Sequence, residues 1–80
     1  MKFSQLIHFY GVNEDNTVTF YVLDDNSQKQ FYRSNARFKL LGELDGYDKD
    51  TALNVEFGLA YIKGKGLVLQ LIRVFDVIEG

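Results

Sequence analysis

The sequence predicts a single all-β domain whose five short strands close into a small barrel. Apolar and polar residues alternate along several segments, which is typical of strands with one buried side. Clusters of Asn, Asp, Ser and Gly separate these segments and favour turns. A chain of 80 residues buries enough surface for one core and not for two, so we expect one domain over residues 1–80.

The first 33 residues predict a three-stranded meander. Residues 3–12, 17–23 and 28–33 are rich in β-branched and aromatic residues, which favour strands. Residues 13–16 and 24–27 are expected to be turns, because Asn and Asp side chains bond to their own backbone and tolerate left-handed dihedral angles.

The next segment, residues 35–44, is ambiguous. Phe38, Leu41 and Leu44 fall at the i, i+3 spacing of a helix, whereas Gly42 weakens a helix. We expect a short helix or an irregular crossover here, followed by a loop to residue 50.

The C-terminal part predicts a long hairpin. Odd-numbered positions are apolar from residue 53 to 61, and glycines mark a hairpin tip at 62–67. The last strand, 67–77, is apolar on both sides, which indicates a central strand or a bulge where Gln70 and Arg73 break the alternation. Five such strands favour closure into an OB-like barrel, with an SH3-like barrel as the alternative because periodicity does not fix strand order.

Catalytic and metal chemistry are not expected. His8 is the only histidine, there is no cysteine, and no serine lies in a G-x-S-x-G context. The acidic loop 43–50 departs from the calcium-loop spacing, and Gly64-Lys65-Gly66 lacks the Walker pattern. We therefore expect a protein that is not an enzyme and that carries no cofactor and no metal.

The composition also predicts where the protein works. A cysteine-free small domain is typical of a reducing compartment, so we expect a cytoplasmic protein. The N-terminal residues lack the pattern of a signal peptide, and no apolar run approaches the length of a membrane span. No membrane partner is expected.

Charge is distributed unevenly along the chain, whose formal net charge is −2. Acidic residues gather in the expected turns, while residues 26–42 and 62–73 contain basic residues and no acidic ones. This pattern fits a solvated surface with acidic turns equally well as a basic, aromatic-rich binding surface on an acidic domain. The net charge argues against wrapping of duplex DNA.

Aromatic and basic residues alternate closely in several strands, which favours binding of single-stranded nucleic acid. Such proteins need aromatic rings on which bases stack and cations that contact phosphates. We expect Phe3, Phe20, Phe57 and Phe75 to fill the core, and tyrosines to lie at the surface because their hydroxyls can remain hydrated. The candidate binding residues are Tyr10, Tyr21, Lys29, Tyr32, Arg33, Arg37, Lys39, Tyr61, Lys63 and Lys65.

The C-terminal hairpin carries a resemblance to a known family. Residues 53–57 (LNVEF) and 61–74 (YIKGKGLVLQLIRV), and more faintly Phe20-Tyr21-Val22, resemble the small OB-fold single-stranded-DNA-binding proteins of filamentous phages. The turn at 13–16 departs from that family, in which an extended basic wing reaches for DNA. The resemblance implies a dimeric coating protein for single-stranded DNA in replication, from a phage or mobile element, with RNA as an alternative ligand.

A second class of function stays open. Small acidic β-domains also bind and modulate or inhibit other proteins, and the acidic turns could serve this purpose. The aromatic residues would then form the core and a dimer interface. In either case the apolar residues on both sides of 67–74 predict a homodimer, since one barrel interior covers only one side of a strand.

Overall fold

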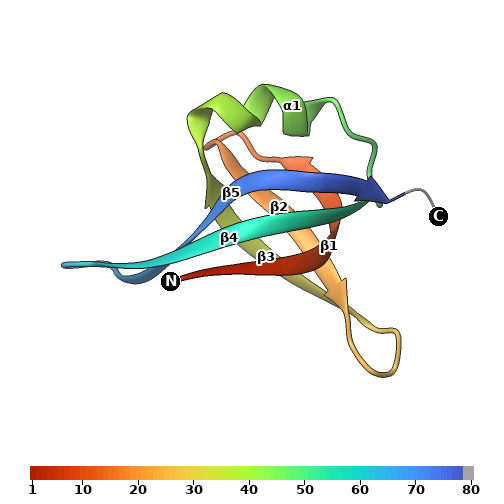
Figure 1. Cartoon of the computed structure of the whole chain (residues 1–80), viewed down its shortest axis with the longest axis horizontal. Helices are drawn as coiled ribbons and strands as arrows, with labels where there is room; N and C mark the ends of the chain where they lie inside the picture. Colours follow the sequence, from red (N-terminus) through yellow and green to blue (C-terminus); the bar gives the residue numbers. More distant parts are fainter. Residues whose placement is uncertain (79–80) are drawn as a thin grey trace.

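A computed structural model describes residues 1–78 and contains five strands, with a short helical segment between the third and the fourth (Figure 1). The all-β class and the five-stranded barrel are confirmed. The elements are β1 (Lys2–Val12), β2 (Thr17–Leu23), β3 (Lys29–Ala36), the 3₁₀ helix η1 (Phe38–Leu40), α1 (Leu41–Asp45), β4 (Ala52–Ile62) and β5 (Gly66–Ile78).

The strands close in the order β1-β2-β3-β5-β4, and β4 pairs with β1. All neighbours are antiparallel except β3 and β5, which run parallel over two residue pairs, Asn35 with Gln70 and Ala36 with Leu71. This order, with a helical segment between β3 and β4, is that of an OB-like barrel. The sequence pattern leaves the choice between an OB-like and an SH3-like barrel open, because the two differ in strand order and periodicity does not fix that order.

The core is formed by inward-facing residues of β1, β2, β4 and β5 and by two leucines of the helical segment. Phe20 and Phe57 are buried as expected, and their rings lie 5.1 Å apart. Phe3 and Phe75 are exposed, contrary to expectation, because Phe3 lies next to the N-terminal end of β1 and Phe75 is skipped in the pairing of β5 with β4. The other buried apolar residues of the cluster are Ile7, Phe9, Val18, Leu40, Leu44, Leu53, Val55 and Leu71.

The ambiguous segment is helical and covers one end of the barrel, as Figure 1 shows. Leu40 and Leu44, at i, i+4 spacing, are the buried residues, whereas Phe38 is 83% exposed. Of the two alternatives left open for this segment, a short helix and an irregular crossover, the structure has the helix, and Phe38 is not on its buried side. The third strand also extends three residues beyond the expected end, to Ala36, because its last residues pair with β5.

Two bulges bend β5 around the barrel. The pairing with β4 skips Ile72, between Arg73 and Leu71, and skips Phe75, between Asp76 and Val74. The first bulge lies next to Arg73, where the broken alternation predicts one. Beyond the barrel, β4 and β5 continue as a two-stranded arm (Figure 1), on which Tyr61 is 73% exposed.

The described part of the chain, residues 1–78, contains no helix with the length and apolar character needed to cross a membrane. Helical structure there is limited to the two short elements η1 and α1.

Truncation of Leu71 should destabilise the barrel far more than the same truncation of Leu67. Leu71 is fully buried next to the β3–β5 closure, and Leu67 on the same strand is 69% exposed. We expect Leu71→Ala to lower the free energy of unfolding by about 2–5 kcal/mol, because it leaves a cavity. Leu67→Ala should change it by no more than about 0.5 kcal/mol. Urea unfolding of the two variants measures the difference, and equal losses would contradict the assigned strand orientation.

Candidate nucleic-acid interface

Four aromatic rings form a continuous row on the outer side of β1, β2 and β3. Since Phe9 and Phe20 face the core, their neighbours point outward. The rings of His8 and Tyr21 stack at 4.9 Å between centroids, and Tyr21 lies 5.2 Å from Phe31. Tyr10 meets Phe31 edge to face at 5.1 Å. We call the residues His8, Tyr10, Tyr21 and Phe31 the aromatic face.

The strand register explains why these rings meet. His8 lies opposite Tyr21, and Tyr21 lies opposite Phe31 on the next strand. Tyr10 is the extra residue of a bulge in β1, since the pairing with β2 shifts between Phe9 and Gly11. The bulge places the Tyr10 ring beside the row on the neighbouring strands.

The four rings differ in how much surface they present. Phe31 is 50% exposed and Tyr10 is 41% exposed, so each offers ring surface to a ligand. Tyr21 is only 4% exposed, contrary to the expected surface position of the tyrosines, because His8, Phe31 and Lys29 surround its ring. Tyr21 therefore supports the aromatic face from the centre, and Phe31 and Tyr10 are its accessible rings.

Cations border the aromatic face. The Lys29 ammonium lies 4.8 Å from the centre of the Tyr21 ring, and the Lys49 ammonium lies 4.5 Å from that of Tyr10. Arg33 lies two residues beyond Phe31 on β3 and so shares its side. Both Lys29 and Arg33 also have an acidic neighbour, Asp50 at 3.8 Å and Asp15 at 3.9 Å respectively.

A hydrogen bond from Tyr21 to Asp50 ties the loop before β4 to this face. The phenol donates to the carboxylate at 2.6 Å. The same loop is held to β1 by backbone bonds, because the Asp50 amide donates to the Phe9 carbonyl at 2.7 Å. These bonds position Lys49 beside Tyr10 and hold the Tyr21 ring in place.

The Tyr21–Asp50 contact shifts both pKa values in a self-consistent way. The hydrogen bond to the carboxylate, reinforced by burial, raises the pKa of Tyr21 to about 12. The same hydrogen bond, with the nearby Lys29 and Lys49 ammonium groups, holds the pKa of Asp50 below its ordinary value. The contact therefore stabilises the fold above the ordinary Asp pKa of 3.8 and weakens as the pH falls below it. On the alkaline side, the stabilisation from this contact is fully present below pH 10. It is lost as the pH rises through about 12, where the Tyr21 phenol ionises.

The structure brings four of the ten candidate residues together: Tyr10, Tyr21, Lys29 and Arg33. Tyr32 lies on the other side of β3, where its ring stacks on Phe20 at 5.8 Å, so it does not join this face. Arg37 and Lys39 lie at the start of the helical segment. Tyr61 lies on the β4–β5 arm, and Lys63 and Lys65 lie at its tip.

Three members of the interface were not among the candidates: His8, Phe31 and Lys49. Phe31 shares its side of β3 with Lys29 and Arg33, so strict alternation from either cation selects Phe31 over Tyr32. His8 is two residues before the candidate Tyr10, so alternation along β1 places both on the same side and selects His8 as well. Nothing in the sequence indicates Lys49, because a loop contact brings it to Tyr10.

Comparison of the chain with models of known families, with characterised proteins and with solved structures gave no match. Within residues 1–78, no group of three His, Asp or Glu side chains is placed to hold a metal ion. The case for a function therefore depends on the chemistry of the aromatic face itself.

Replacement of Asp50 should lower the pKa of Tyr21. In Asp50→Asn a neutral acceptor replaces the charged acceptor of the Tyr21 hydrogen bond, which is the largest cause of the raised pKa, so we expect the phenol to titrate below 12. Ultraviolet absorbance is titrated for the wild type and the variant, and the curve of the matching Tyr21→Phe protein is subtracted from each. The difference is the titration of Tyr21. As a matched control, Glu43→Gln removes the carboxylate that Tyr47 contacts at 3.1 Å and should leave Tyr21 unchanged. An Asp50→Asn variant whose Tyr21 still titrates near 12 would contradict the contact.

Proposed function

We propose that this protein is a non-catalytic, single-stranded nucleic-acid-binding domain that uses the aromatic face. The observation that carries the proposal is the unbroken row of four rings, spaced 4.9–5.2 Å apart and bordered by Lys29 and Lys49. Unpaired bases stack on Phe31 and Tyr10, while the ammonium groups contact phosphates. Stacking of this kind tolerates any base, so binding depends little on sequence.

The same features favour a single strand over a duplex. The accessible rings offer flat surfaces, which unpaired bases can cover and paired bases in a helix cannot. The formal net charge of −2 gives little general attraction for the dense charge of duplex DNA. Selectivity for single strands thus comes from stacking, with local cations adding affinity.

Two acidic residues compete with phosphate for the cations. The ion pairs of Lys29 with Asp50 and of Arg33 with Asp15 are 3.8 and 3.9 Å long, and all four side chains are at least half exposed. Exposed pairs of this kind contribute about 0–1 kcal/mol. A phosphate can therefore displace either carboxylate at small cost, and the acidic neighbours do not oppose the proposal.

The β4–β5 arm supports a second candidate, docking of another protein. Tyr61 and Leu67 lie directly opposite each other on the arm and are 73% and 69% exposed. Contiguous exposed apolar surface favours contact with another protein, and this pair supplies part of such a surface. The homodimer expected from the sequence would use this surface. The replication role in a phage or mobile element, which the resemblance implies, and the cytoplasmic location expected from the composition belong to the nucleic-acid-binding proposal.

Loss of the Phe31 ring should weaken binding of single strands. We expect Phe31→Ala to cost about 1–3 kcal/mol, the contribution of one stacked base. Fluorescence anisotropy with labelled oligo-dT, and with duplex of equal length, measures the change. Phe38→Ala removes an exposed phenylalanine outside the aromatic face and should leave affinity unchanged. Failure of wild-type protein to bind oligo-dT at about 10 µM in low salt would overturn the proposed function.

Substitution of Leu67 tests the contact surface on the arm. If the arm joins two copies, Leu67→Lys should shift the protein from dimer to monomer in sedimentation experiments, because it places charge in an apolar contact. Lys63→Gln, at the tip of the same arm, serves as the control. A wild-type protein that sediments as a monomer at high micromolar concentration would contradict the homodimer.

A further inference from the structure

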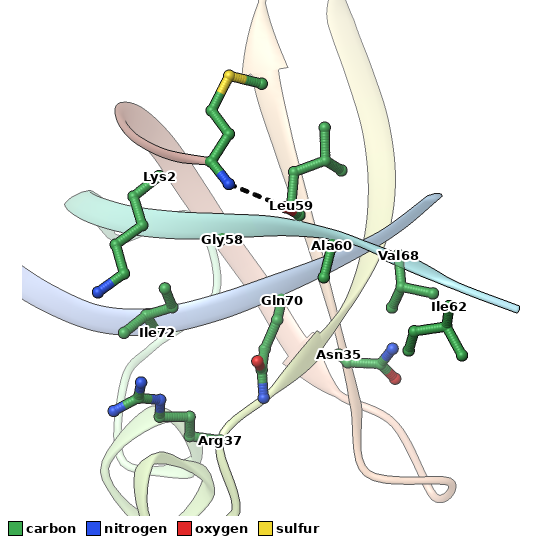
Figure 2. Close-up of a pocket in the computed structure, with 11 residues that line it drawn as sticks. Lys2, Asn35, Arg37, Gly58, Leu59, Ala60, Ile62, Val68, Gln70 and Ile72 are labelled. Carbon is green, nitrogen blue, oxygen red and sulfur yellow. Dashed lines mark hydrogen bonds between the residues drawn. The ribbon is translucent and has the colours of Figure 1, made fainter. Parts of the chain in front are cut away.

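A second concave site lies on the outer surface of the barrel, away from the aromatic rings. It is a groove of about 450 Å³. It lies between the start of β1, the end of β3, the C-terminal half of β4 and the N-terminal half of β5. Figure 2 shows Lys2, Arg37 and Gln70 reaching into it from three different strands or their ends. Neither the proposed stacking function nor the core packing accounts for this groove.

The groove is basic, although the chain as a whole is acidic. Lys2 and Arg37 supply the charged side chains among its lining residues, and no Asp or Glu lines it. Within residues 1–78, neither cation has a carboxylate within ion-pair distance, whereas Lys29, Arg33 and Arg73 each do. Two unpaired cations that converge on one concave surface favour an anionic ligand.

Two carboxamides lie beside the cations. Asn35 and Gln70 are directly opposite each other in the parallel pairing that closes the barrel. Both side chains line the groove, and neither takes part in a side-chain hydrogen bond within residues 1–78. Each amide offers donors and an acceptor, which suits the edges of a base or the oxygens of a phosphate.

The base of the groove is apolar and closely packed. Ile72, the bulged residue of β5, lies over Gly58 of β4, and a Cβ at position 58 would come within 2.8 Å of the Ile72 Cδ1 atom. Glycine therefore allows the isoleucine to lie low against the sheet. The result is an apolar base with polar groups at the rim, an arrangement that suits a nucleotide with a flat ring and a charged phosphate.

Strand β3 connects the groove to the aromatic face. Phe31, Arg33 and Asn35 occupy alternate positions and so share the outer side of the strand, and Arg37 follows directly after it. At about 3.3 Å per residue, the distance along the chain from Lys29 to Arg37 is about 26 Å. This side of β3 thus presents a cation at every fourth position, with Phe31 and Asn35 between them.

We propose that the groove is a second nucleotide subsite, which binds the phosphate backbone of a single strand that continues from the aromatic face along β3. Arg37 and Lys2 contact phosphate oxygens, and Asn35 and Gln70 hydrogen-bond to the base or sugar. This inference rests on the proposed function and extends it, because it gives the strand a direction across the barrel and a longer footprint than the aromatic face alone.

The test compares Arg37→Gln with Lys39→Gln by anisotropy with oligo-dT over a series of salt concentrations. The two residues are exposed, two positions apart and equal in charge, but only Arg37 lines the groove. Loss of one phosphate contact should reduce the slope of log affinity against log salt concentration by about 0.7 in magnitude. It should weaken binding about fivefold at 0.1 M salt. The Lys2→Gln/Arg37→Gln variant should lose about 25-fold, and Lys39→Gln should match the wild type.

A second variant tests the groove by adding a negative charge to it. Gln70→Glu keeps the side-chain size and places a negative charge beside Arg37, so it should weaken binding at least as much as Arg37→Gln, with an unchanged melting temperature. Binding that is unaffected in all groove variants, or equally weakened in Lys39→Gln, would overturn the subsite and leave the aromatic face intact. Absence of binding by the wild-type protein would overturn both proposals.

Discussion

Closure of the barrel depends on one short contact, the parallel pairing of β3 with β5. Only Asn35 with Gln70 and Ala36 with Leu71 pair there, extended by a bond from the Arg37 amide to the Leu71 carbonyl at 3.2 Å. This contact converts an open antiparallel sheet into a closed barrel and seals Leu71 inside. It also brings the outer side of β3 next to β5, so the groove and the aromatic face exist on one continuous surface.

In the proposed function, strand parity separates the residues that pack in the core from those that bind the ligand. Inward residues such as Phe9 and Phe20 fill the core, and their neighbours Tyr10 and Tyr21 lie on the outside. Because the Tyr21 ring is surrounded and hydrogen-bonded to Asp50, the row of rings is held in place before any ligand arrives. A preorganised stacking surface loses little conformational entropy on binding, which favours affinity in a small domain.

Alternation and turn chemistry predict much of this fold from the sequence, including the three-stranded meander and the long C-terminal hairpin. They do not fix the strand order, because the pairing of β3 with β5 joins residues 35 positions apart. The candidate site is predicted less well. Tyr10 and Lys29 follow from the close spacing of aromatic and basic residues in the strands. The choice of Phe31 over Tyr32 depends on which side of β3 faces inward, and Lys49 depends on a loop contact. Exposure of Phe38 shows that helical spacing alone does not identify the buried side.

The central claim is that one outer surface, from His8 across to Phe31, receives a single strand. Amide chemical-shift mapping of labelled protein with a short oligo-dT tests it most directly, because it reports every backbone position at once. The account predicts that the largest shifts occur at His8, Tyr10 and Phe31 and continue along β3 toward Arg37. Shifts confined to the β4–β5 arm, around Tyr61 and Leu67, would contradict it.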